Sequence, residues 1–161
     1  MLLAFAFLCG PALAFDWTVS VDPLTTALGF THVQVERAFG PRLSVYAGPN
    51  LRLYDGLLPT IDGPYFGLGA EVGVRGFFVG AAPEGAWVMA RGVLARVSTR
   101  DPAPDAAAGG YTSGLIGYTA ILGPGLVLSG GLGISWFDYG VGEWGVHGVL
   151  PAAHTNFGWA F

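Results

Sequence analysis

Polar and ionisable side chains stand at alternating positions in several apolar segments of this chain. His32, Gln34 and Glu36 alternate with apolar residues, and Glu71 and Arg75 lie four positions apart in a second segment. Carboxylate, imidazole and guanidinium groups could transfer protons, bind an ion or pair with one another. Because an apolar interior penalises unpaired charge, we expect pairing, with the partners of Glu71 and Arg75 on neighbouring strands. The predicted polar network comprises His32, Gln34, Glu36, Tyr46, Asn50, Arg52, Glu71, Arg75, Arg91 and Asn156.

Histidine, serine and acidic side chains also allow an alternative in which a base activates a nucleophilic hydroxyl. Their spacing in the sequence fixes none of these groups to another, and a lone histidine in a strand is more often packed or solvated. The sequence therefore predicts no catalytic residue. The groups that the alternative would use are His154 beside Thr155, or His147 with Asp138 and Glu143, and Ser129 or Ser135 as the nucleophile.

The chain offers little for metal, thiol or nucleic-acid chemistry. Cys9 is the only cysteine, all seven basic residues are arginine, and the formal net charge is -4. The acidic residues do not have the spacing of a calcium-binding loop. We therefore predict no metal, no cofactor and no nucleic-acid partner. The acidic residues that we assign to solvated external links are Asp22, Asp55, Asp62, Asp101, Asp105, Asp138 and Glu143.

The composition does not suit an ordinary water-soluble domain. Only 11% of the 161 residues are charged, whereas soluble domains carry about 25%. The sequence contains no uninterrupted apolar run of about 18 residues, so a membrane-spanning helix is not predicted. A closed β-barrel is the other way to satisfy backbone groups in lipid, and the 27 glycines suit curved, closely packed strands.

Alternation of apolar and polar residues continues through most of the chain. Leu43, Val45 and Ala47, for example, share one face, and Ser44 and Tyr46 share the other. About eight strands of roughly ten residues predict an all-β fold, a closed antiparallel eight-stranded up-and-down transmembrane β-barrel. The expected strands cover residues 16–21, 25–38, 42–54, 64–78, 87–97, 111–122, 126–137 and 150–161.

Short and long connections take turns along the chain, as they do in outer-membrane barrels. This rule predicts that both termini lie at the periplasmic end, with the long links outside. The short turns are expected at 39–41, 82–85 and 123–125, and the long links at 55–63, 98–110 and 138–149; the first outer link, at Asp22 and Pro23, is brief. We expect the link at 98–110 to be mobile because its sequence is low in complexity.

The first 14 residues combine a short apolar run with Ala12-Leu13-Ala14, a small-x-small cleavage pattern. We interpret residues 1–14 as a secretory signal peptide, although no basic residue precedes the apolar run. Residues 15–161 then form a single outer-membrane barrel domain. Cys9 would be removed with the signal peptide, leaving a chain without cysteine.

The chain resembles the small eight-stranded outer-membrane barrels of the OmpA and OmpX type, and uncharacterised Gram-negative barrels of similar plan. The resemblance rests on the hairpin at 33–44 and on the ending Asn156-Phe157-Gly158-Trp159-Ala160-Phe161. It covers nearly all of the chain after the signal peptide and brings no catalytic set with it. It implies that an aromatic last strand, here Phe157, Trp159 and Phe161, is read by the outer-membrane assembly machinery.

These observations predict a monomeric, integral outer-membrane protein without enzymatic activity. We expect its lumen to be filled with side chains rather than open as a pore, and its role to be structural or in surface interaction. Its expected partners are outer-membrane lipid, lipopolysaccharide and the assembly machinery. The alternatives are a barrel enzyme that modifies the acyl chains of lipid A, and a soluble lipocalin-like calyx with its apolar face inward.

Overall fold

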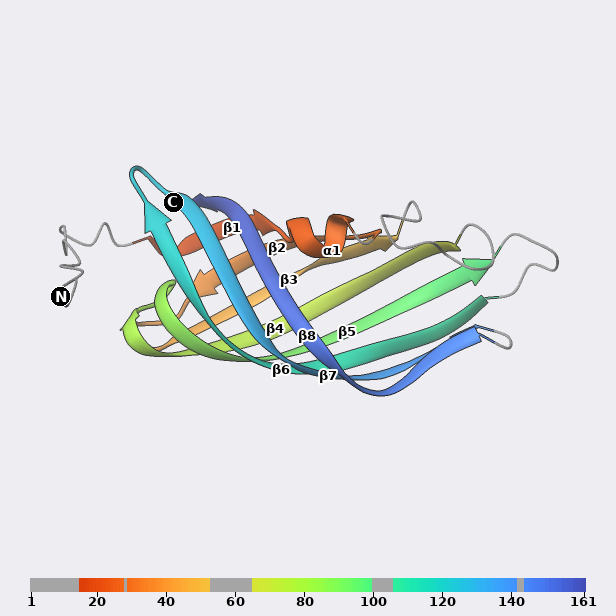
Figure 1. The fold of residues 1–161 in the computed structure, drawn as a ribbon. Helices are drawn as coiled ribbons and strands as arrows, with labels where there is room; N and C mark the ends of the chain where they lie inside the picture. Colours follow the sequence, from red (N-terminus) through yellow and green to blue (C-terminus); the bar gives the residue numbers. More distant parts are fainter. Residues whose placement is uncertain (1–14, 28, 53–64, 100–105, 142–143) are drawn as a thin grey trace, which may run out of the picture.

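The computed structural model describes residues 15–27, 29–52, 65–99, 106–141 and 144–161, which form a closed barrel of eight antiparallel strands and one short helix (Figure 1). The predicted eight-stranded up-and-down β-barrel is confirmed. The proposed signal peptide, residues 1–14, lies outside the described residues. The elements are β1 (Trp17–Val21), α1 (Pro23–Ala27), β2 (Phe30–Ala38), β3 (Leu43–Arg52), β4 (Tyr65–Ala81), β5 (Glu84–Thr99), β6 (Ala106–Leu122), β7 (Leu126–Val141) and β8 (Trp144–Ala160).

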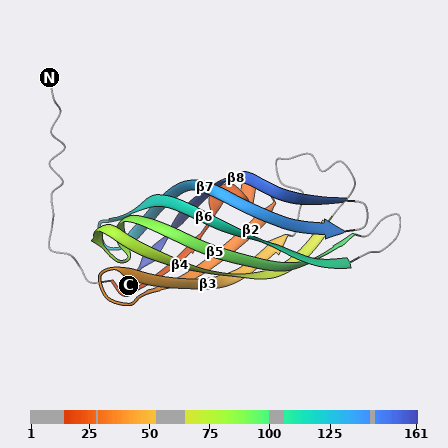
Figure 2. The ribbon, with the colours of Figure 1, turned by 90° about the horizontal axis from the view of Figure 1, so that it is seen from below.

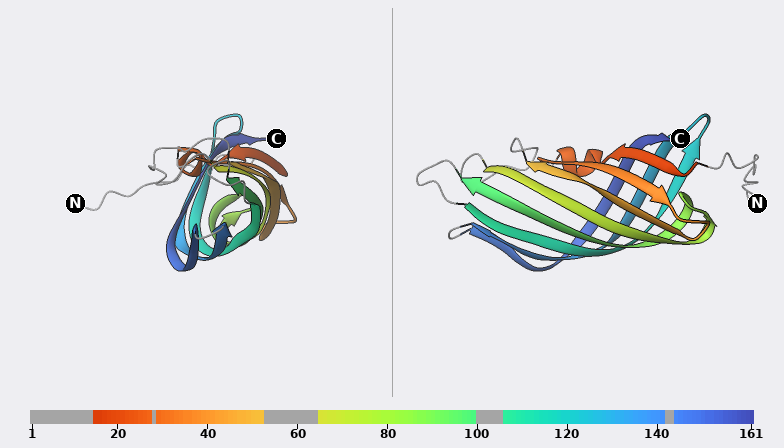
Figure 3. Two further views of the ribbon diagram at one scale, coloured as in Figure 1. Left: turned by 90° about the vertical axis from the view of Figure 1, so that its right-hand side faces the viewer. Right: turned by 180° about the vertical axis from the view of Figure 1, so that it is seen from behind.

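Each strand pairs with its neighbours in the sequence, and β1 pairs with β8 to close the barrel. The closing ladder is short, because β1 has only 5 residues whereas β8 has 17. It runs from the Thr18–Ala160 pair to the Val21–Phe157 pair. The backbones of Trp17 and Phe161 extend this ladder by exchanging two hydrogen bonds of 3.1 and 2.9 Å. In the described residues α1 takes the place of a longer β1 and packs on β2 and β8 (Figure 3).

Side-chain alternation along each strand divides the barrel into a polar or packed interior and an apolar exterior. In β4 the charged residues Glu71 and Arg75 are buried, while Val72 and Val74 between them are exposed. Because successive side chains of a strand point to opposite faces, this order turns one face of every strand towards the lumen. The alternation seen in the sequence therefore determines which wall each residue faces.

The interior has layers, and β5 passes through all of them. Its inward residues begin with Trp87 and Met89, continue with Arg91 and end with Val93 and Val97, all of them buried. The first two belong to a packed cluster close to the short turns; its members are Tyr46, Phe77, Trp87, Met89 and Leu115. Charged side chains therefore occupy the middle of the lumen, between an aromatic layer and a layer of small apolar residues.

Two inward glycines make room for the large rings of this interior. A Cβ added to Gly73 would lie 2.2 Å from the ring of Tyr46, and one added to Gly131 would lie 2.5 Å from the ring of Trp87. No other residue type fits beside these rings at such distances. The rings can therefore lie across the neighbouring strands, which closes the lumen at this level.

Both described chain ends lie at the barrel end that carries the short turns (Figures 1 and 2). The turns between β2 and β3, β4 and β5, and β6 and β7 match the predicted short turns. At the opposite end the strands run further than predicted: β5 continues to Thr99, β6 begins at Ala106, and β7 and β8 extend to Val141 and from Trp144. Much of the two links predicted at 98–110 and 138–149 is therefore strand, whereas the link predicted at 55–63 lies outside the described residues.

The start of the second predicted strand is also wrong, because residues 23–27 form α1. Asp22 explains the helix: its carboxylate accepts a hydrogen bond of 3.1 Å from the backbone N–H of Thr25, and Pro23 occupies the first helical position. An acceptor side chain before a first-turn proline is a helix N-terminal signature. No described helix is long and apolar enough to cross a membrane.

Candidate functional site: the polar lumen

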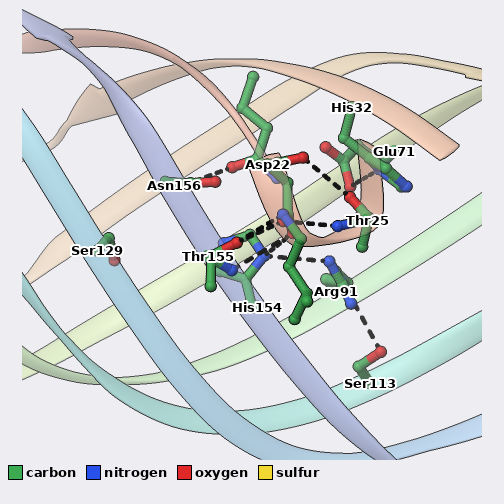
Figure 4. Close-up of polar contacts among 12 residues, drawn as sticks. Asp22, Thr25, His32, Glu71, Arg91, Ser113, Ser129, His154, Thr155 and Asn156 are labelled. Carbon is green, nitrogen blue, oxygen red and sulfur yellow. Dashed lines mark hydrogen bonds and ion pairs between the residues drawn. The ribbon is translucent and has the colours of Figure 1, made fainter. Parts of the chain in front are cut away.

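The structure places most of the predicted polar network together inside the barrel. The buried members are His32, Gln34, Glu36, Tyr46, Asn50, Glu71, Arg75, Arg91 and Asn156. Arg52 lies at the end of β3, and its side chain is outside the described part of the structure. The lumen therefore holds the candidate site, in the region that Figure 4 shows.

Arg75 is the centre of one cluster. Its Nη1 donates to Glu36 Oε2 at 2.6 Å, and its Nη2 lies 3.0 Å from Nε2 of His154. The guanidinium also lies over the rings of Tyr46 and Trp87, at 5.1 and 5.0 Å from their centroids. A buried cation is thus stabilised by a carboxylate, an imidazole and two aromatic faces.

Glu36 is held from two further directions. Ser44 donates a short hydrogen bond to its Oε1, and Thr18 donates to its Oε2 at 3.3 Å. These hydroxyls come from β3 and β1, on either side of the strand that carries Glu36. The carboxylate therefore ties three adjacent strands to Arg75 of β4.

His154, which is completely buried in β8, links this cluster to Asp22 and Arg91 (Figure 4). Its Nδ1 lies 3.3 Å from Asp22 Oδ2 and 3.2 Å from Arg91 Nη1. Because a guanidinium can only donate, Arg75 presents an N–H to Nε2, while Nδ1 faces both an N–H of Arg91 and the carboxylate of Asp22. The imidazole is therefore enclosed by charged groups from three other parts of the chain.

Asp22 fastens α1 to β8. Thr155 donates from its hydroxyl to Asp22 Oδ1 at 2.6 Å, and its backbone N–H lies 3.4 Å from Asp22 Oδ2. The backbone N–H of Leu24 donates in turn to the Thr155 hydroxyl at 3.2 Å. This carboxylate therefore replaces the strand contacts that the short β1 cannot supply to β8.

A second acid–base pair joins β2 to β4. His32 Nδ1 lies 3.0 Å from Glu71 Oε2, and Asn50 lies 3.1 Å from the other ring nitrogen of His32. The ion-pair partners of Glu71 and Arg75 are thus on β2, with a second contact of Arg75 to His154 on β8, and not, as predicted, on the neighbouring strands β3 and β5. The reason is that β3 places the small residues Gly48 and Ser44 opposite them, so that the long side chains reach across.

Hydroxyl and amide groups complete the lumen. Ser113 contacts Arg91 at 3.4 Å and Ser135 at 2.6 Å, while the indole N–H of Trp87 donates to Thr119 at 2.9 Å. Two further contacts, at 2.8 Å, join Thr119 to Ser129 and Asn156 to Gln34. Side chains from every strand therefore meet one another within the barrel.

This geometry does not assemble a nucleophile and a base. In the described residues no serine hydroxyl contacts a histidine, and Ser129 lies apart from His154 in Figure 4. His147 does lie 2.9 Å from Asp138, as one alternative required, but both side chains are largely exposed, and Glu143 is outside the described residues. What the lumen supports is mutual charge pairing.

The described residues contain no group of three or more side chains that could hold a metal ion. The paired carboxylates of the lumen are occupied by arginine, histidine and hydroxyl partners. Four buried polar atoms of the network nevertheless have no hydrogen-bond partner among the described residues: Gln34 Nε2, Tyr46 Oη, Glu71 Oε1 and Arg75 Nε.

The outer wall has the opposite character. Phe157, Trp159 and Phe161 are exposed, and large apolar side chains are exposed on every strand. A lipocalin-like calyx would need these aromatic residues buried and Glu36, Glu71 and Arg75 outside. The observed arrangement is the reverse, which counts against that alternative.

Two central residues were not part of the predicted polar network: Asp22, which was assigned to the wrong place, and His154, which was left out. We expected Asp22 to be solvated in an external link, yet it is fully buried. The pattern Asp22-Pro23 is a helix N-terminal signal and could have revealed it. His154 stands on the same strand face as Asn156, so the alternation already placed it inside.

Comparison of the chain with protein-family models, with curated proteins and with solved structures gave no match.

Proposed function

We propose that this protein is an integral outer-membrane β-barrel whose lumen is closed by its own side chains and whose role is structural or in surface interaction. The observation that carries the proposal is that the distribution of side chains is the reverse of that in a water-soluble protein: ionic groups are buried in the lumen, and large apolar groups cover the outer wall. In water such a wall would be costly, whereas lipid would cover it.

The strand lengths support this proposal. The 17 residues of β6 extend about 56 Å, or about 40 Å along the barrel axis at a tilt near 45°. The apolar band of such barrels is about 25 Å tall, and the 9 and 10 residues of β2 and β3 match that requirement. The longer strands would then project beyond the membrane on the side away from the short turns.

The last strand supports it as well. Phe157, Trp159 and Phe161 place aromatic rings on the outer wall at the end that carries the short turns. Aromatic girdles of membrane barrels lie at the two interfaces. We propose that these residues are the assembly signal and that this end faces the periplasm.

The lumen supports a role without transport or catalysis. Buried side chains fill an eight-stranded barrel, and here they are joined by ion pairs and hydrogen bonds. Such a barrel leaves its ends and outer wall as the surfaces that contact other molecules.

The test is folding into phospholipid vesicles. The full chain should float with the vesicles, migrate differently on a denaturing gel before and after boiling, and give no stepped conductance in a planar bilayer. Failure to float would contradict the membrane proposal, and stepped conductance would contradict the closed lumen.

A second experiment tests the enzyme alternative. Lipid A from cells with and without expression should have the same mass; an acyl change lost with His154→Ala would favour the enzyme alternative.

A further inference from the structure

The outer wall carries an apolar groove of about 540 Å³ along β5 and β6. Its floor is made by the small residues Ala90, Gly92, Thr112 and Gly114. The groove is bordered on one side by Val45, Val72 and Val74, and on the other by Ile134 and Trp136. The floor residues face outward, because the residues that alternate with them, Arg91 and Ser113, are buried in the lumen.

The packing of the barrel does not require this groove. A Cβ added to Gly92 or Gly114 would meet no atom within 4 Å, in contrast to the inward Gly73 and Gly131. The floor could therefore hold larger side chains without strain, and neither glycine has a positive φ. The shape of the wall at this place is thus independent of the closure of the lumen.

An arginine, Arg96, lies on β5 beyond the groove. Arg96 follows Gly92 by four residues on the same face of β5, about 13 Å along the strand towards the end opposite the short turns. Leu94 lies between them and is strongly exposed at 76%. Arg96 is exposed and makes no hydrogen bond or ion pair with the described residues.

Arg96 differs from the other outward charged residues of the described part of the chain in its position and in its lack of a partner. Arg37 and Arg42 lie at the short-turn end, where Arg37 stacks on Trp17. Across the groove Asp138 is already paired with His147. Among the described residues, Arg96 is therefore the unpaired outward charge on β5, two outward positions beyond the last β5 residue that lines the groove.

We propose that this groove binds one glycerophospholipid, with an acyl chain against Gly92 and Gly114 and the phosphate on Arg96. The inference rests on the proposed membrane location. Charge complementarity selects the occupant: an apolar chain fits the floor, and an anionic phosphate fits the exposed guanidinium of Arg96 further along β5. A second copy of the chain would bring a second Arg96 to the same border and is disfavoured by like charge.

The test is native mass spectrometry of the full chain, folded in detergent and incubated with dioleoyl phosphatidylglycerol or with dioleoylglycerol, which lacks the phosphate. The wild type should retain one phosphatidylglycerol. Gly114→Leu should lower retention about tenfold, the effect of displacing roughly two methylene groups. Arg96→Gln should lower the retention of phosphatidylglycerol about fivefold. The wild type should retain dioleoylglycerol no better than Arg96→Gln retains phosphatidylglycerol.

Gly130→Leu is the matched control, because Gly130 is an outward strand glycine outside the groove with no atom within 4 Å of an added Cβ. It should retain lipid like the wild type. Equal loss in both leucine variants, unchanged retention in Arg96→Gln, or a dimer that Gly114→Leu abolishes would each overturn the proposal. Vesicle flotation of the same samples separates these results from failure of the membrane location itself.

Discussion

Arg75 is the residue on which the lumen depends most, because it joins Glu36 and His154 between two aromatic rings. Arg75→Met leaves the Glu36 carboxylate buried without its cation. We expect the free energy of unfolding in vesicles to fall by about 3–5 kcal/mol, measured by tryptophan fluorescence in urea.

The double variant Arg75→Met/Glu36→Leu removes both charges and should recover at least half of that loss. Arg37→Met, which removes an exposed arginine stacked on Trp17, should cost no more than about 1 kcal/mol. A protein that tolerates Arg75→Met as well as Arg37→Met would show that the buried pair contributes little.

Asp22 is the second residue with a specific role, since it caps α1 and binds Thr155 of β8. Asp22→Ala removes the cap and the contact to β8, and we expect a loss of about 2 kcal/mol or more in the same unfolding measurement. Asp138→Ala, at an exposed ion pair, should change stability by less than about 1 kcal/mol. Equal effects of the two substitutions would contradict the role of Asp22.

At the scale of elements, the seam between β1 and β8 is the shortest ladder of the barrel. Thr18 and Ala160 face each other there, both buried. Trp17 and Phe161 form a hydrogen-bonded pair of the antiparallel ladder, so the adjacent pair, Thr18 and Ala160, is a non-hydrogen-bonded pair. The Cα atoms of such a pair are about 4.5 Å apart. A disulfide between cysteines at these positions is therefore geometrically allowed.

Thr18→Cys/Ala160→Cys, in a chain that lacks Cys9, should form an intramolecular disulfide on oxidation. Because the cross-link keeps the unfolded chain compact, the boiled protein should migrate faster on a denaturing gel without reductant than with it. Thr18→Cys/Ser113→Cys places its cysteines on β1 and β6 and should not cross-link. Absence of the first disulfide, or equal formation of both, would mean that β1 and β8 do not close the sheet.

The strands themselves could be predicted because alternation is a local property of the sequence. Glu71, Arg75 and Arg91 were placed inside by parity alone, and the structure has them buried. The partners of these residues could not be predicted, because they depend on what the intervening strand places opposite them: Ser44 and Gly48 open the way to β2. The register between β3 and β4 therefore determines which side chains pair with Glu71 and Arg75.

The misjudged ends of strands have a similar cause. Residues 106–110 and 144–149 read as links because they are rich in glycine and alanine or lack strict alternation, yet neighbouring strands hold them in the sheet. Pro151 is tolerated in β8 because its backbone nitrogen faces the side where β1 has ended, where no ladder hydrogen bond is lost. A single strand does not contain this information about its neighbours.

In the whole molecule, ionic side chains are buried inside the barrel and large apolar side chains cover its outer wall. Burying ionic groups in a narrow lumen requires that each finds a partner, and exposing aromatic and aliphatic groups requires an apolar surrounding. Both conditions are met together if the barrel lies in a membrane and its charged residues serve its own closure.

The most direct test is a scan of nitroxide spin labels along β7, from residue 127 to residue 136, in the full chain folded into vesicles. Labels at Leu128, Leu132, Ile134 and Trp136 should be accessible to oxygen dissolved in the lipid, whereas labels at Val127 and Ser135 should be accessible to neither oxygen nor a water-soluble nickel reagent. Outer-wall labels that respond to the nickel reagent, or accessibility that does not alternate along the strand, would contradict the account.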